Sequence, residues 1–193
     1  SLPEAKQQEI MSSSEWTRAV FVREPKERVL SAFTDKALSE PSYMQSWCCP
    51  KTPNLKSCME KMSDFGYFLN LTQTYCKWDP HWKPQYLYVD KHWWPFMNFV
   101  GYSETLADDF EKILKSLHST KDGVSAWDRV GKSGWDLSHG CNSTSDVAFG
   151  RQIFHSKSHG TTTGTVEKLK RYYTPELEAL VEKAYKEDFE SPF

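Results

Sequence analysis

The sequence predicts an α/β fold in which a mostly parallel sheet is flanked by helices. Two short apolar runs, residues 19–22 and 96–102, are rich in β-branched and aromatic residues, as buried strands are. Each run is followed by a segment in which apolar residues recur at helical spacing. Because strands alternating with helices build layered sheets, we expect three layers, with the ligand at the carboxyl ends of the strands.

The helix expected over residues 25–38 begins at Pro25. Proline suits the first helical position because it lacks an N–H that would stay unpaired there and its φ is already helical. The helix is expected to pack on the preceding strand through apolar residues at helical spacing, namely Val29, Leu30, Phe33 and Ala37.

Three further helices follow from the same kind of pattern. One is expected over residues 55–70, and one over residues 106–117 with Ser103 as its N-cap. Thr174 followed by Pro175 is a capping residue with a proline at the first helical position, and it opens the last helix. Residues 122–149 lack sustained periodicity and are expected to form a long surface connection.

Length and composition indicate one folded domain over residues 1–193. The chain is 38% hydrophobic and 15% aromatic, which argues against disorder. A formal net charge of −2 provides no basic field, so we expect no nucleic-acid partner. No apolar run approaches the ~20 residues that span a bilayer, and the first residues lack a signal-peptide pattern, so any membrane anchor is expected outside this chain.

The cysteines leave two interpretations open. The chain has five, and four of them lie between residues 48 and 76. In an oxidising lumen they would form one or two disulfides that staple a loop, and in cytosol they could bind a metal, although their spacing fits no regular zinc pattern. The N-glycosylation sequons at Asn70 and Asn142 favour a secretory compartment.

The passage from the first strand into the first helix is a candidate phosphate site. It would bring free backbone N–H groups and the positive end of the helix dipole to one place, beside Arg23. The alternative is an ordinary strand-to-helix connection in which Arg23, Lys26 and Arg28 are solvated charges.

Three blocks of sequence carry a family resemblance. They are Arg23 to Phe33, His81 to Tyr86 with Asn98 to Leu106, and His159 to Phe189. Together they resemble the membrane-bound carbohydrate sulfotransferases, in particular the chondroitin 4-sulfotransferase type. The first resembles the R-[DE]-P-x-x-R-x-x-S-x-F pattern that holds the 3′-phosphate of 3′-phosphoadenosine 5′-phosphosulfate (PAPS). The second is similar to that type's HW-x-PQ and DFIGKFETL segments, and the third to its H-x-T…KL…YYTPEL…YxxDF ending.

The resemblance implies a P-loop-like sulfotransferase fold, here partial, and PAPS as the sulfate donor without a metal. The family's other donor element, a P-K-[TV]-[GA]-[ST]-[ST] turn that grips the 5′-phosphosulfate, lies before the Arg23 block and has no counterpart here. The chain is then either the C-terminal part of a longer catalytic domain or a shell that has lost this element. The resemblance also implies a Golgi lumen or another secretory compartment.

Sulfuryl transfer needs a clamp on the donor and a base for the acceptor hydroxyl. Arg23 can offer a bidentate guanidinium to a phosphate and Ser31 a hydroxyl, while Arg28 is expected to pair with a carboxylate or stabilise the turn. Lys157 and His159, in a stretch rich in Ser and Thr, could close over the 3′ side of the nucleotide or simply be a solvated loop.

His81 is the candidate base, because histidine is the commonest general base near neutral pH. Its alternative role is a structural loop cap. The candidate acceptor contacts are Trp78, Trp82, Lys83 and Gln85. Exposed, the two tryptophans could stack on sugar rings, and buried, they would be core.

Two function classes therefore compete. One is a sulfotransferase that acts on a carbohydrate hydroxyl, and the other is an inactive sulfotransferase-like binding or scaffold protein. A P-loop kinase is disfavoured because no G-x-x-x-x-G-K-[ST] occurs. The acceptor sugar, the position sulfated and the oligomeric state are not predicted.

Overall fold

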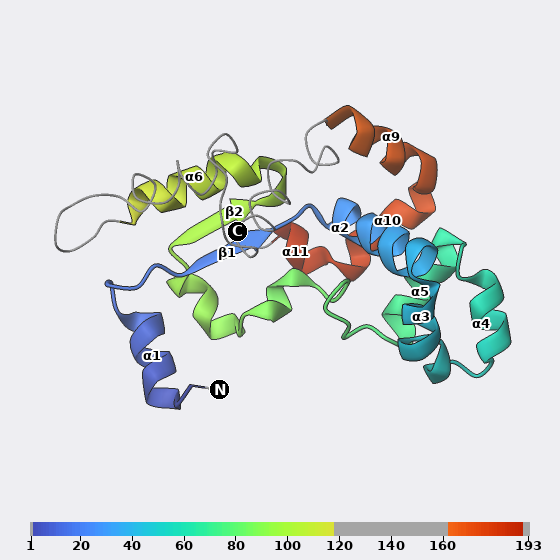
Figure 1. Cartoon of the computed structure of the whole chain (residues 1–193), viewed down its shortest axis with the longest axis horizontal. Helices are drawn as coiled ribbons and strands as arrows, with labels where there is room; N and C mark the ends of the chain where they lie inside the picture. The colour runs from blue at the N-terminus through green and yellow to red at the C-terminus, as the bar shows by residue number, and fades with distance from the viewer. Residues whose placement is uncertain (1, 118–161, 191–193) are drawn as a thin grey trace, which may run out of the picture. The chain divides into compact units, whose positions relative to one another are not determined.

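The computed structural model describes residues 2–117 and 162–190 (Figure 1). It divides into two compact units. The strand unit comprises Ser1–Val22 and His92–Thr162, and the helical unit comprises Arg23–Lys91 and Thr163–Phe193. The single domain expected over residues 1–193 stays a prediction.

The described elements are mostly helical, with two short strands. In chain order they are α1 (Glu4–Ser12), β1 (Ala19–Val22), α2 (Pro25–Ala32), the π-helix η1 (Phe33–Ser39), α3 (Pro41–Trp47), the 3₁₀ helix η2 (Cys49–Lys51), α4 (Leu55–Lys61), α5 (Phe65–Thr74), the 3₁₀ helices η3 (Gln85–Tyr88) and η4 (Lys91–Phe96), β2 (Phe99–Tyr102), the 3₁₀ helix η5 (Ser103–Thr105), α6 (Leu106–Ser116), α9 (Thr162–Tyr172), α10 (Pro175–Ala184) and α11 (Lys186–Glu190).

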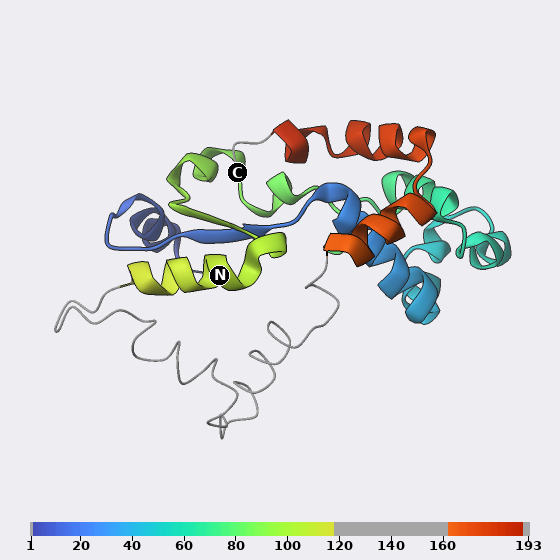
Figure 2. The same cartoon turned by 90° about the horizontal axis from the view of Figure 1, so that it is seen from above.

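The strand unit is built on a parallel pair, as predicted. β1 and β2 pair from Ala19 opposite Phe99 to Val22 opposite Tyr102. Helix α6 runs beside this pair (Figure 2) and stacks Phe110 on Phe21, with ring centroids 4.5 Å apart. Among the described residues the sheet has only these two strands, which is smaller than the three-layered sheet that we expected.

Two expectations near β2 are wrong. The strand begins at Phe99 and not at residue 96, because the preceding residues form η4, whose Pro95 has no N–H for a ladder. Ser103 does not cap α6. It opens η5, its buried hydroxyl has no hydrogen-bond partner among the described residues, and Thr105 is the residue before α6.

Gly101 is a position where a side chain does not fit. It lies opposite Phe21 in the strand pair, and a Cβ added to it would overlap the Phe21 ring. That ring is held by its stacking on Phe110. We expect Gly101→Ala to lower the free energy of unfolding by about 1–3 kcal/mol, the usual range for overpacking.

Gly66 provides the matched control for this prediction. A Cβ there meets its nearest neighbours at 3.4 Å, an ordinary contact, and the residue lies in the first turn of α5. Gly66→Ala should leave the stability unchanged or raise it by up to about 1 kcal/mol through helix propensity. Urea denaturation of the two variants measures the difference, and equal effects would contradict it.

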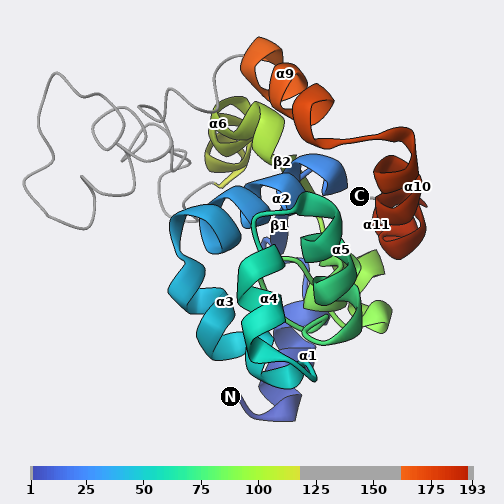
Figure 3. The ribbon, with the colours of Figure 1, turned by 90° about the vertical axis from the view of Figure 1, so that its right-hand side faces the viewer.

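The helical unit has an extensive apolar core. Helices α2, α3, α4 and α5 gather in it, and α10 packs against α2 and α5 (Figure 3). The predicted apolar residues of the first helix, Val29, Leu30, Phe33 and Ala37, are all buried, but the core that they join is made of residues of the helical unit, and not of the preceding strand on which we expected them to pack. Two disulfides, Cys48–Cys76 and Cys49–Cys58, close the cysteine-rich segment, so the expectation of loop-stapling disulfides is confirmed and metal binding by these cysteines is excluded.

The helix predicted over residues 55–70 is instead two helices. The first, α4, ends at Lys61. Asp64 is the N-cap of the second, α5, because its Oδ1 accepts the Tyr67 N–H at 2.6 Å. The helix predicted to open at Thr174 and Pro175 is confirmed as α10, with Pro175 first and the Thr174 hydroxyl accepting the Leu177 N–H, but it is not the last helix, because α11 follows it.

Candidate functional site

The first turn of α2 is organised by acidic side chains. Glu24 is the N-cap and its carboxylate accepts the Glu27 N–H at 2.7 Å. Glu27 in turn lies 3.6 Å from the Nε atom of Arg23, which is half-buried. The sequence suggested free N–H groups here. The structure differs, because the Glu27 N–H is bound by Glu24 and two carboxylates offset the positive end of the helix.

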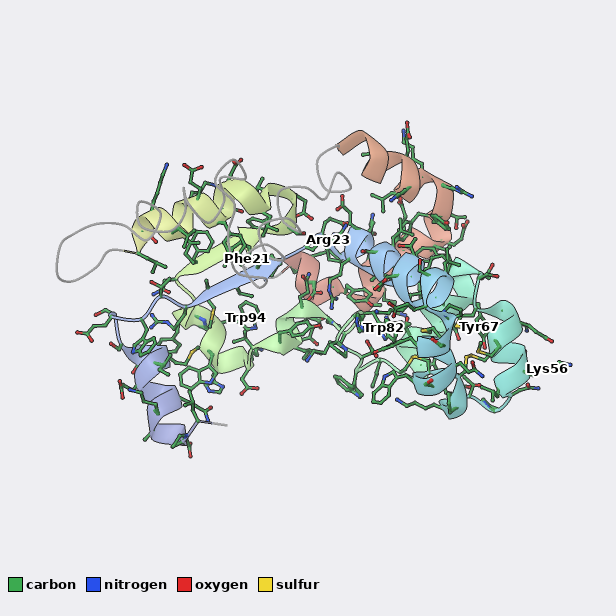
Figure 4. The ribbon with its side chains drawn as sticks, viewed as in Figure 1. Phe21, Arg23, Lys56, Tyr67, Trp82 and Trp94 are labelled. Atoms are coloured by element: carbon green, nitrogen blue, oxygen red, sulfur yellow. A yellow bond between two sulfur atoms is a disulfide. The ribbon has the colours of Figure 1, made fainter. Side chains whose placement is uncertain are left out.

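Glu27 and Ser31 are four residues apart within α2 and therefore share one side of that helix, and Arg23 (labelled in Figure 4) reaches Glu27 from two residues before the helix. Ser31 is half-buried, one turn beyond Glu27. A guanidinium and a hydroxyl suit a phosphate, but an anion that bridges them meets the Glu27 carboxylate between them. The donors that fit a phosphate here are thus side chains, with Glu27 competing for Arg23.

Arg28 fastens a distant loop to α2. Its guanidinium donates to the backbone oxygens of Lys83 at 2.8 Å and Pro80 at 3.0 Å, and to the Tyr88 hydroxyl at 3.1 Å. These hydrogen-bond partners are carbonyls and a hydroxyl, so of the two roles expected for Arg28 they favour holding the backbone over pairing with a carboxylate. Through Arg28 the first motif block holds the second, which carries His81.

Gln85 makes a second link between the same blocks. Its Oε1 accepts the Arg23 N–H at 2.8 Å and its Nε2 donates to the Arg23 carbonyl at 2.7 Å. The N–H groups of Gln85 and Tyr86 donate to the carboxylate of Asp188, in the third block. Burial raises the pKa of Asp188, although these two hydrogen bonds lower it. Gln85 was predicted to bind substrate, but it is buried and its side-chain amide is hydrogen-bonded to the backbone of Arg23.

His81 lies in a hydrogen-bonded group with Asp79 and Tyr43. The Asp79 carboxylate is buried, and its Oδ1 lies 2.8 Å from Nδ1 of His81 and accepts the His81 backbone N–H at 2.9 Å. The Tyr43 hydroxyl donates to the other oxygen, Oδ2, at 2.6 Å. Burial, and then this bond to Asp79, raise the pKa of Tyr43 well above its usual value.

Asp79 was not among the predicted site residues. Its signal was the Asp-x-His spacing, since aspartate commonly bonds the backbone N–H two residues on. That pattern indicates a turn, but it does not reveal burial or the approach of Tyr43 from α3, which depend on the tertiary structure.

The acceptor candidates separate by exposure. Trp78 is 66% exposed beneath the Lys77 ammonium, whereas Trp82 is fully buried and donates its indole N–H to the Cys76 carbonyl. The Lys83 ammonium lies 4.2 Å from the centroid of the Tyr88 ring. Exposure therefore favours Trp78 as a sugar contact and favours the core alternative for Trp82.

Some predicted features lie elsewhere. Lys157 and His159 lie outside the described residues.

Within the described ranges no group of three or more His, Cys, Asp or Glu side chains is placed to hold a metal ion. Nor does any helix in those ranges have the length and apolar character to cross a bilayer.

Comparison with known proteins gives one positive result. A model of the sulfotransferase family matches residues 1–191, nearly the whole chain. The searches of curated proteins and of solved structures found no match. The match spans all three motif blocks, and Arg28, Gln85 and Asp188 connect these blocks by hydrogen bonds. The chain belongs to the sulfotransferase family.

Proposed function

We propose that the protein is a carbohydrate sulfotransferase of the chondroitin 4-sulfotransferase type, which moves the sulfuryl group of PAPS to a glycan hydroxyl. The observation that carries the proposal is the fastening of the His81 loop to the start of α2 by Arg28 and Gln85. It joins a candidate phosphate clamp and a candidate base within one unit. Transfer by positioning and electrostatics needs such an arrangement.

In this proposal Arg23 and Ser31 hold the 3′-phosphate of the donor. Arg23 offers two parallel N–H groups to phosphate oxygens, and Ser31 adds a hydroxyl donor. Lys157 and His159 are proposed to contact the same nucleotide. Arg28 acts indirectly, because its guanidinium is used to hold the Pro80 and Lys83 carbonyls.

The acceptor is proposed to approach from the side of His81, with Trp78 and Lys83 as its contacts. His81 takes the proton of the attacking hydroxyl. Trp78 presents an exposed indole on which a sugar ring can stack. Lys83 adds a cation suited to an acidic sugar.

A secretory compartment, such as the Golgi lumen, is proposed for the location. Two disulfides in one helical segment support it, because disulfides persist in oxidising compartments and are rare in cytosol. The exposed Asn70, in the first sequon, is compatible with the same address.

The proposed clamp is tested with the desulfated product, 3′,5′-adenosine bisphosphate. Binding to the native state must raise Tm as the ligand concentration passes Kd. We expect a saturable rise for the unaltered chain, and a loss of about 1.5–3 kcal/mol of binding free energy in Arg23→Ala, the scale of a charge-assisted hydrogen bond. Isothermal calorimetry provides the affinities.

Two further variants sharpen this test. Glu27→Gln removes the carboxylate that competes for Arg23, so it should bind the nucleotide as tightly as the unaltered chain or more tightly. Lys56→Ala removes a lysine whose side chain is 87% exposed on α4 and serves as the control for loss of one positive charge. Equal affinity of Arg23→Ala and Lys56→Ala would contradict the clamp, and no binding by any of them would favour an inactive scaffold.

A further inference from the structure

The tautomer of His81 follows from its surroundings. An ionised carboxylate can only accept hydrogen bonds, so an Asp79 oxygen 2.8 Å from Nδ1 requires a proton on that nitrogen. The Tyr43 hydroxyl cannot replace it, because its single proton is directed to Asp79 at 2.6 Å, while Nδ1 is 3.3 Å away. Nε2 is therefore the basic nitrogen of neutral His81.

Asp79 is held so that this arrangement is rigid. Its side chain is fully buried, and three donors converge on it, namely the His81 backbone N–H, the His81 Nδ1–H and the Tyr43 hydroxyl. The His81 side chain is 38% exposed, so the imidazole meets both the buried carboxylate and solvent. A buried acceptor behind a half-exposed imidazole is the arrangement that orients a general base in hydrolases.

We propose that Asp79 is a positioning residue for sulfuryl transfer, which sets the His81 tautomer and stabilises the imidazolium that forms when His81 accepts the acceptor's proton. This inference rests on the proposed function and adds a residue that the sequence analysis did not select. Tyr43 supports it by satisfying the second oxygen of Asp79.

The step balances as a substitution at sulfur. The acceptor oxygen forms a bond to sulfur as its proton passes to Nε2 of His81, and the bond between sulfur and the bridging phosphate oxygen breaks. The electron pair of that bond leaves with 3′,5′-adenosine bisphosphate. Asp79 accepts the Nδ1–H of His81 throughout and faces an imidazolium after the transfer.

Other charged groups near this site are fixed by their own partners. Tyr43 faces His81 from α3 with ring centroids 5.2 Å apart, and the Lys36 ammonium of η1 lies 5.2 Å from the Tyr43 ring. Lys36 is paired with Asp35 and Glu40. Asp79 is thus the carboxylate in direct contact with the imidazole among the described residues.

The test begins with a readout that needs no activity. Nitrogen-15 NMR of histidine-labelled protein distinguishes the two tautomers, and His81→Gln identifies the His81 signals among the six histidines. We expect the Nδ1–H form in the unaltered chain and a mixture of tautomers in Asp79→Asn, whose amide can turn either an acceptor or a donor to the ring. A dominant Nε2–H form in the unaltered chain would overturn the proposal.

The second readout is catalysis, with PAPS and chondroitin as the probes. Asp79→Asn should lower kcat about 10- to 100-fold with little change in KM, because an imidazole held in a mixture of tautomers does not always present a free Nε2 to the acceptor hydroxyl. A merely structural role would leave the tautomer ratio of His81 unchanged.

The matched control is Asp64→Asn, because Asp64 is an exposed N-cap of α5 and asparagine caps equally well. It should retain the unaltered kcat. Binding of 3′,5′-adenosine bisphosphate separates the two proposals. No binding by the unaltered chain contradicts the proposed function, whereas intact binding with an unchanged kcat in Asp79→Asn overturns only the role of Asp79.

Discussion

Replacing Trp82 with alanine is expected to lower the free energy of unfolding by about 3–5 kcal/mol, the range for removing a buried aromatic side chain. Trp82 is fully buried, with Phe68 and Tyr43 packed edge-on against its indole. The truncation leaves a cavity among these rings and also leaves the Cys76 carbonyl without the indole N–H, which is 2.8 Å away.

Trp78→Ala is the matched control, four residues away in the same segment. Its side chain is 66% exposed, and the Lys77 ammonium lies 4.9 Å from the centroid of its ring. An exposed cation–π pair contributes about 0.5–1 kcal/mol, so Trp78→Ala should change stability by no more than that. Urea denaturation followed by circular dichroism compares the pair, and similar midpoints for the two variants would show that the burial of Trp82 is wrong.

The two tryptophans also show where prediction from sequence ends. Both lie in the same aromatic, proline-interrupted segment, and the sequence offers nothing local to separate them. Their difference arises from distant residues, since Tyr185 donates its hydroxyl to the Trp82 carbonyl at 2.6 Å and Phe68 packs on its ring. Burial of an aromatic side chain is a property of the tertiary structure, so the acceptor-contact prediction treated the two residues alike.

Local signals were sufficient where a short segment sets its own conformation. Strand β1, the proline start of α2 and the Thr174 cap of α10 were predicted because each follows from adjacent residues. The same local method failed at Asp64, because a continuous apolar period hid a capping residue inside it. It also failed at Ser103, where a 3₁₀ turn precedes the helix.

The sequence predicted individual residues of the candidate site, but not how their segments are held together. Arg23, Ser31 and His81 were identified, but the links between their segments depend on Arg28, Gln85 and Asp188, which bond across wide separations in the sequence. The acidic Glu27 beside Arg23 was visible in the sequence. Glu27 is paired with Arg23 and lies one turn before Ser31, so an anion that joins Arg23 to Ser31 would meet its carboxylate. The sequence did not reveal this competition, because it depends on the ion pair that the structure shows.

Removing the Cys48–Cys76 disulfide is the second change with a large expected effect. The bond joins residues 28 apart, whereas Cys49–Cys58 joins residues 9 apart. In the chain-entropy account, closing these loops in the unfolded state contributes ~3.6 and ~2.6 kcal/mol respectively. The double variant Cys48→Ala with Cys76→Ala should therefore lose about 1 kcal/mol more stability than Cys49→Ala with Cys58→Ala.

The two double variants control for each other, since all four cysteines are buried in the same core and each variant removes two sulfur atoms. Urea denaturation under non-reducing conditions provides the two free energies. The Cys48–Cys76 bond also joins the end of α3 to the residues before the Asp79–His81 turn, so its loss should weaken the proposed sulfation of chondroitin as well as stability. A larger loss of stability from the shorter loop would contradict the entropic account, and would mean that packing around Cys49 and Cys58 decides the stability of this segment.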